Sequence, residues 1–187
     1  MHASGSRGSL VWDIRSAKVT RELPGAKSGL CAFSPDNKCL LTSSGTRCSS
    51  WEVGSWKCLH SFEREGAGDL PSPVAITMDC RLVAVAYSRR AVRLLDSTTW
   101  KELATLEPPD SAELFDLRFN SEGTLLAAVS TYAIHLLDLR SIRQQLAAMR
   151  LDWDLPPLPP SATNQFQGPI TVRVLAGANQ PSAEAGP

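Results

Sequence analysis

The chain has 187 residues, enough for one domain or part of a larger one, and its 19 Lys and Arg balance 19 Asp and Glu. A formal net charge of zero gives no electrostatic drive toward nucleic acid or an anionic membrane surface. No apolar run approaches the roughly 18–20 residues that a membrane helix needs. The start MHASGSRGS lacks the apolar core of a signal peptide, and five cysteines without a C-x-x-C pair favour a reducing, cytoplasmic setting.

Three segments predict the same β-hairpin: LVWDIRSAKVTRELP at 10–24, SSWEVGSWKCLHSFE at 49–63 and RLLDSTTWKELATLE at 93–107. In each, an acid after Trp or Leu is followed five residues later by a lysine, and a fourth Leu-Asp pair comes further on. The repeat signature is therefore Trp12-Asp13, Trp51-Glu52, Leu95-Asp96 and Leu137-Asp138, at intervals of 39, 44 and 42 residues. A period of this length is typical of a propeller or solenoid array.

The segments between the hairpins also repeat, because FSPDNKCLLTSS (33–44), ITMDCRLVAVAY (76–87) and FNSEGTLLAAVS (119–130) align without a gap. Each has a polar turn and then a short apolar run, which suits a strand buried on both faces. The sequence thus predicts an all-β chain with four strands per period. We expect strands near 9–13 and 18–23, then 28–33, 39–44, 48–53 and 57–62, then 73–77, 82–87, 91–96 and 101–106, and finally 114–119, 124–129 and 133–137.

Four short antiparallel strands per period make one blade of a β-propeller. Over residues 8–139 the chain resembles the WD-repeat (WD40) family, through the Trp-Asp pair, the FSPD turn and the acid-turn-Lys pattern. The family usually has an Asp at the positions that hold Gly45, Arg89 and Thr131 here, and no Gly-His pair opens a blade. The resemblance implies a partial propeller over 1–139, about three four-stranded blades plus two strands of another.

Such an arc does not close a ring, since propellers have roughly 4–8 blades. If an end blade leaves about four large apolar side chains exposed to water, the burial free energy that is lost is on the order of 10 kcal/mol. This is comparable to the unfolding free energy of a whole domain, about 5–15 kcal/mol. We therefore expect self-association or the addition of further propeller blades.

After the last repeat the pattern changes to helical spacing, which predicts a C-terminal helix at 141–150 within a region 140–154. Ser141 with Gln144 reads as a capping box, and an apolar stripe of Ile142, Leu146 and Met149 should dock on the final blade, with Arg143 among the residues on other sides. We expect Trp153 to anchor the end of the helix and Pro156-Pro157 to turn the tail away.

Residues 155–187 are rich in Pro, Ala, Gly and Ser, so we expect a mostly disordered tail. Within it, PITVRVLA (169–176) alternates like a strand and could supply the fourth strand of the last blade. The stretch LRSIRQQLAAMRLDWDLPPLPP resembles the C-terminal ends of bacterial WD-repeat proteins, some of which carry a protein kinase domain upstream.

The sequence predicts no catalytic residues, no cofactor and no metal site. The three histidines are scattered, and four cysteines (Cys31, Cys39, Cys48 and Cys58) fall one per strand along a single blade at spacings that match no compact zinc pattern. Candidate interaction residues are the hairpin tryptophans Trp56 and Trp100, either stacked over their hairpins or exposed as anchors, and the basic pair Arg89-Arg90, either a solvated tip or a contact for an acidic partner.

The resemblance implies a non-enzymatic scaffold that binds a protein or peptide partner through blade loops. One alternative is the regulatory C-terminal piece of a WD-repeat Ser/Thr kinase, although the chain has neither a Gly-rich loop nor a His-Arg-Asp motif. Another is a propeller hydrolase, for which no paired acid and base candidates are evident.

Overall fold

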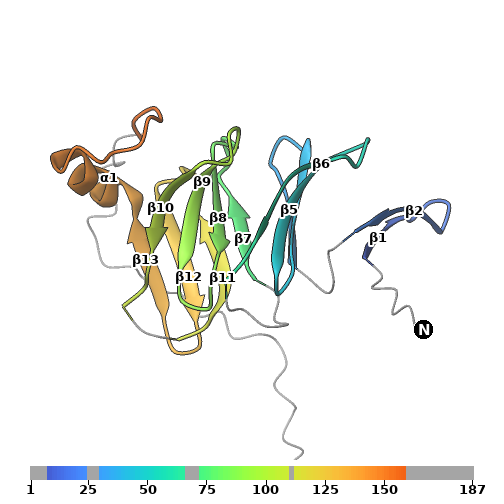
Figure 1. Cartoon of the computed structure of the whole chain (residues 1–187), viewed down its shortest axis with the longest axis horizontal. Helices are drawn as coiled ribbons and strands as arrows, with labels where there is room; N and C mark the ends of the chain where they lie inside the picture. The colour runs from blue at the N-terminus through green and yellow to red at the C-terminus, as the bar shows by residue number, and fades with distance from the viewer. Residues whose placement is uncertain (1–7, 25–29, 66–71, 110–111, 159–187) are drawn as a thin grey trace, which may run out of the picture.

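The computed structural model describes residues 8–24, 30–65, 72–109 and 112–158. Within these ranges it contains thirteen strands, paired antiparallel in four separate sheets, and one short helix. The sheets follow one another in chain order, from two N-terminal strands at one end of the row to the last sheet and the helix at the other (Figure 1). The all-β prediction is confirmed, and the arrangement is consistent with part of a propeller.

The four sheets have two, four, four and three strands. The first contains β1 (Ser9–Asp13) and β2 (Lys18–Leu23). The second contains β3 (Leu30–Phe33), β4 (Cys39–Ser43), β5 (Arg47–Glu52) and β6 (Cys58–Glu63). The third contains β7 (Val74–Ile76), β8 (Leu82–Ala86), β9 (Val92–Asp96) and β10 (Glu102–Leu106). The fourth contains β11 (Leu114–Phe119), β12 (Leu125–Ser130) and β13 (Ile134–Asp138), and α1 (Leu139–Ala148) follows it.

Every strand predicted within the described residues forms, with bounds within two residues of those expected. Strand neighbours in each sheet are also neighbours in the chain, so each sheet is a simple meander. The predicted segment 169–176 lies outside the described residues. Among the described residues, β13 is therefore an edge strand of the fourth sheet.

The hydrophobic core lies between the sheets rather than inside any one of them. In β8 all five residues are buried, because Leu82, Ala84 and Ala86 pack toward the fourth sheet while Val83 and Val85 pack toward the second. A separate cluster around Leu23, Leu40 and Trp51 joins the first two sheets. The continuous apolar run of β8 was thus correctly interpreted as a strand covered on both faces.

The turn before the second strand of each four-strand repeat is built in the same way three times. Oxygens at equivalent positions accept the backbone N–H of the residue five positions later: Ser34 from Cys39 at 2.9 Å, Thr77 from Leu82 at 3.0 Å and Asn120 from Leu125 at 2.9 Å. The third residue after each acceptor has a positive φ, which Gly123 tolerates most easily. These side chains accept hydrogen bonds from backbone N–H groups and so fix where β4, β8 and β12 start.

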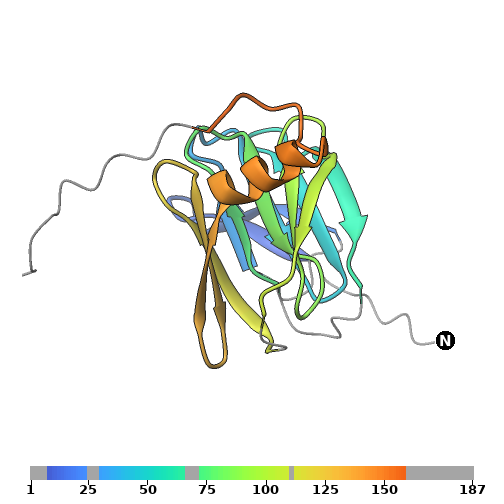
Figure 2. The ribbon, with the colours of Figure 1, turned by 90° about the vertical axis from the view of Figure 1, so that its left-hand side faces the viewer.

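The helix begins two residues earlier than predicted, and Ser141 is not its N-cap. Asp138 has extended dihedrals and accepts from the N–H groups of Arg140 and Ser141, so Asp138 caps the helix. The predicted capping box of Ser141 and Gln144 is therefore wrong, because the N-cap lies about one helical turn earlier, at Asp138. In Figure 2, β13 runs directly into α1, which lies across one end of the sheets.

The apolar stripe of the helix is only partly as predicted. Ile142 and Leu146 pack against the core between the third and fourth sheets, but Met149 is 59 % exposed. Arg143, expected on another side, is buried. It lies four residues after Leu139 and three before Leu146, so it shares their face of the helix.

The segment after the helix folds back instead of leaving the blade. Trp153 is buried in the same core, as predicted for an anchor, and Leu155 and Leu158 pack beside it. Pro156-Pro157 therefore does not turn the chain away at once. Helix α1 and residues 151–158 together form a C-terminal cap on the third and fourth sheets.

Candidate interaction surfaces

The four repeat acids have one local role, which is to hold the turn that follows them. A hydroxyl three residues later donates to each acid: Ser16 to Asp13, Ser55 to Glu52, Thr99 to Asp96 and Ser141 to Asp138. In the first three copies the turn then closes a hairpin through a residue with positive φ (Ala17, Trp56 and Trp100). In the fourth copy the same bonds start α1. The spacing of an acid and a Ser or Thr three residues later is visible in the sequence and would have predicted these hydrogen bonds.

These bonds favour the ionised form of Asp13 and Asp96. The backbone N–H of Arg15 and the hydroxyl of Ser16 lower the pKa of Asp13 below its ordinary value. For Asp96, partial burial raises the pKa, but the hydrogen bonds from Thr99 and Thr98 outweigh it and the net shift is downward. Fixed, charged acceptors of this kind stabilise turns and are poorly suited to carry protons near neutral pH.

The residue before each acid faces the preceding sheet. Trp51 is 3 % exposed, and its Nε1 donates to Thr42 Oγ1 at 2.9 Å. Leu95 is buried against the second sheet, and Leu137 packs against the third. Trp12 occupies the same position in the first sheet but is 58 % exposed. One repeat position is thus buried where a preceding sheet is present and open where the described residues provide none.

The two hairpin tryptophans turn toward neighbouring sheets. The Trp100 ring stacks on His60 of β6 with centroids 5.2 Å apart and meets Phe62 at 6.1 Å. Trp56 packs against the cluster that joins the first and second sheets. Both rings are half-buried, so each has one side available to a partner and one side committed to packing between sheets.

The basic pair lies at the tip of the turn between β8 and β9, away from α1. Arg89 and Arg90 are both exposed, and Arg89 forms a long ion pair of 3.8 Å with Glu113. An exposed pair at this distance contributes little to stability, about 0–1 kcal/mol. The two guanidinium groups are therefore accessible to an acidic partner.

The fourth sheet presents an open apolar surface, which we call the trailing face. It consists of Leu125, Ala127, Val129, Ile134 and Leu136, which the pairing of β12 with β13 places on one side. Ile134 and Leu136 are 67 % and 69 % exposed, whereas the equivalent residues one repeat earlier, Val92 and Leu94, are fully buried. This is the side on which each preceding sheet packs against the next one.

The first sheet presents the complementary side, which we call the leading face. It consists of Leu10, Trp12 and Val19, all exposed, while Val11 points the other way into the cluster shared with the second sheet. Trp12 and Val19 are directly paired across β1 and β2. Both ends of the row of sheets therefore expose apolar residues, and the positions of Trp12, Ile134 and Leu136 are buried at internal junctions.

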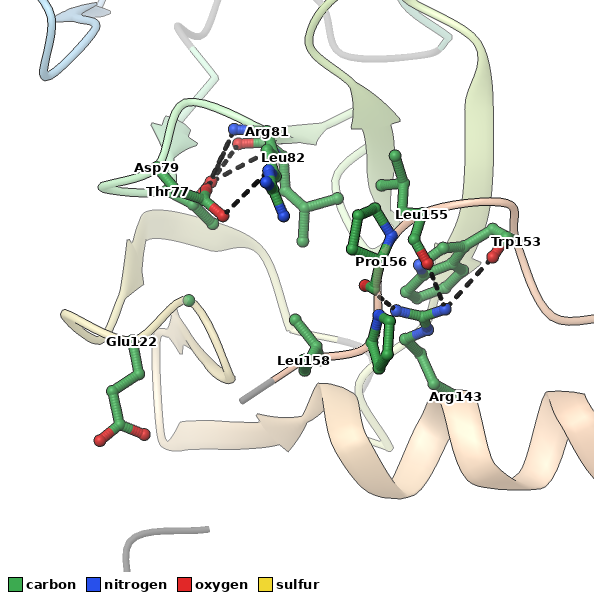
Figure 3. A pocket seen from close by; sticks show the side chains of 12 residues that line it. Thr77, Asp79, Arg81, Leu82, Glu122, Arg143, Trp153, Leu155, Pro156 and Leu158 are labelled. Atoms are coloured by element: carbon green, nitrogen blue, oxygen red, sulfur yellow. Dashed lines mark hydrogen bonds and ion pairs between the residues drawn. The ribbon is translucent and has the colours of Figure 1, made fainter. Parts of the chain in front are cut away.

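The C-terminal cap is held by one arginine, which sequence reasoning placed on the wrong side of the helix. Arg143 pairs with Asp152 through two hydrogen bonds of 3.0 and 2.9 Å. It also donates to the carbonyl oxygens of Pro156 at 2.7 Å, Leu155 at 2.9 Å and Trp153 at 3.2 Å (Figure 3). The Asp152 carboxyl has a lowered pKa, chiefly because Arg143 hydrogen-bonds to it.

A small cavity lies between the cap and two turns of the sheets, the first containing Thr77 and the second Glu122 (Figure 3). Its volume is about 40 Å³. Pockets for drug-sized ligands measure roughly 300–1,000 Å³, so this one fits small solvent molecules only. It is a packing gap beside Arg143 rather than a substrate site.

No two of the five cysteines are joined by a disulfide. Four of them fall one per strand on β3 to β6, as expected, and the fifth, Cys80, lies in a turn. Burial raises the pKa of the Cys48 thiol to about 12, so it behaves as a small apolar side chain. Within the four described ranges, no three His, Cys, Asp or Glu side chains come together in a way that could hold a metal ion. Among the described residues, no helix is long and apolar enough to cross a membrane.

Comparison with known proteins assigns no relationship: no family model matches the chain, and no curated protein is significantly similar to it.

Proposed function

We propose that this chain is part of a WD-repeat β-propeller and works as a non-enzymatic protein-interaction scaffold in the cytoplasm. Support comes from the repeated construction of its sheets. Three turns share one side-chain acceptor pattern, and four repeat acids share one hydroxyl partner pattern. Repeats built this way present rigid sheets whose loops and end faces are available to partners.

The observation that carries the proposal is the pair of open faces at the ends of the row. Burying an apolar side chain of this size contributes about 1.5–3 kcal/mol. Ile134 and Leu136 are about two-thirds exposed, so covering them and the rest of the trailing face contributes on the order of 3 kcal/mol. Because their counterparts one repeat away are buried, we take the two faces as the protein interaction sites of this scaffold.

The kinase-associated alternative stays a prediction, since it concerns sequence upstream and no feature of residues 8–158 that the structure describes favours it. A hydrolase is not supported either, because the repeat acids are engaged in turns.

Photo-crosslinking tests the proposal. A benzoylphenylalanine placed at Leu136 or Trp12, in cells that make the protein, should give discrete covalent adducts whose masses identify what covers each face. Gln145, exposed on α1 and outside both faces, is the control position and should give none. If the two faces yield no adduct, or yield the same products as Gln145, the end faces do not bind proteins and the proposed function is wrong.

A further inference from the structure

The two open faces belong to opposite sides of a sheet, so one fits the other. The trailing face is the side that receives a following sheet, and the leading face is the side that meets a preceding one. We propose that two copies of this chain associate head to tail, with the leading face of each copy packed on the trailing face of the other. This inference rests on the proposed function and names the occupant of its binding faces.

The junctions inside the chain show what such a contact looks like. Between the second and third sheets, Leu41 and Cys48 from one side meet Val83, Val85 and Leu95 from the other. The trailing face has Ala127 and Ile134 at the positions of the first group. The leading face has Trp12 at the position of Leu95. Among the described residues, the first sheet has no strand equivalent to β8, so the proposed contact reproduces the Leu95 side of this junction but not the contacts of Val83 and Val85.

The exposed area indicates a closed pair rather than an open string. At about 25 cal/mol/Å², a fully buried Leu or Ile corresponds to roughly 100 Å², and an aromatic ring to about 200 Å². Scaled by the exposed fractions, each face offers on the order of 200 Å² of apolar surface. Since apolar atoms make up about 60 % of an interface, one junction buries roughly 700 Å².

One junction alone is below the roughly 1,000 Å² expected of a specific interface, whereas two reach the standard range of about 1,200–2,000 Å². A pair of copies that closes on itself forms two identical junctions, as a head-to-tail contact does when its rotation closes. Each copy supplies four sheets in its described residues, and a pair supplies eight, within the roughly 4–8 blades of known propellers.

Sedimentation of the purified full chain tests the inference. At concentrations near 10–50 µM the wild type should sediment as a dimer, a range in which standard-size interfaces are normally occupied. Leu136→Asp and Trp12→Asp should each give a folded monomer, because both side chains are exposed within one copy. Met78→Asp is the matched control: Met78 is 63 % exposed in a turn outside both faces, and its replacement should leave the dimer intact.

The two variants also distinguish this arrangement from a symmetric one. If two trailing faces met each other, Trp12→Asp would remain a dimer, and that result overturns the head-to-tail assignment. An equal mixture of the two variants retains one intact junction per pair, so it should show weak association that neither shows alone. A folded wild-type monomer at 50 µM overturns the inference, yet leaves the scaffold function standing if crosslinking at Leu136 captures a different protein.

Discussion

Replacing Arg143 by Ala should release the C-terminal cap and lower stability markedly. Its guanidinium makes five hydrogen bonds, two to Asp152 and three to backbone carbonyls, and its side chain is only 10 % exposed. Breaking a buried charge pair costs about 3–5 kcal/mol, and hydrogen bonds to charged groups contribute about 1.5–3 kcal/mol each without adding up. Asp152 is 28 % exposed and regains water, so we expect a net loss of about 3 kcal/mol.

For a chain of this size each kcal/mol shifts Tm by roughly 2–4 °C, so Arg143→Ala should lower Tm by about 6–12 °C. Hydrogen exchange of α1 should accelerate as well, because a ten-residue helix is marginal once undocked. Arg140→Ala is the matched control on the same helix. Arg140 pairs with Glu122 at the surface, at 25 % and 41 % exposure, and its loss should cost at most about 1 kcal/mol. Equal effects of the two substitutions, with helix exchange unchanged, would refute the role of Arg143.

Acidification gives a second readout of the same contact. Arg143 lowers the folded-state pKa of Asp152 below its ordinary value of 3.8. The stability gained from this pair is therefore fully present above pH 3.8 and is lost as pH falls through the lower folded value. The gap in unfolding free energy between wild type and Arg143→Ala should narrow below pH 3.8. A gap that stays constant down to pH 2 would show that the ion pair does not stabilise the fold.

Three further outcomes follow from the same contacts. Asp138→Ala removes the N-cap of α1 and should cost about 0.5–2 kcal/mol, measured by chemical denaturation, whereas Asp138→Asn should cost much less; equal losses would contradict the capping role. Leu146→Asp should lower Tm or increase aggregation because Leu146 packs on the core, while Gln145→Asp on the exposed side should do little; no difference between them would mean that the helix is undocked. A thiol reagent should label exposed Cys31 in the native protein but reach Cys48 only on unfolding, since Cys48 is fully buried with a pKa near 12; fast labelling of both would show that the sheets open readily.

The sequence by itself determined the strands and their grouping. Alternating and continuous apolar runs report which faces of a strand are covered, and the 39–44-residue period fixes how strands group into sheets. Turn chemistry is also local, since an acid and a hydroxyl three residues apart meet wherever the chain turns. For these reasons β1, β8 and β13 were placed from the sequence with small errors.

Only the tertiary structure decided the roles of residues whose partners are distant. Trp12 and Trp51 have the same local pattern, but one is exposed and the other buried, because among the described residues only the second has a preceding sheet to pack against. The Asp138 turn continues into a helix rather than a hairpin because Leu139 and the cap pack on the sheets. Arg143 is charged, so a hydropathy pattern assigns it to solvent. Its hydrogen-bond acceptors, the Asp152 carboxylate and backbone carbonyls, lie 9–13 residues further along the chain. They surround the guanidinium only once the chain has folded back.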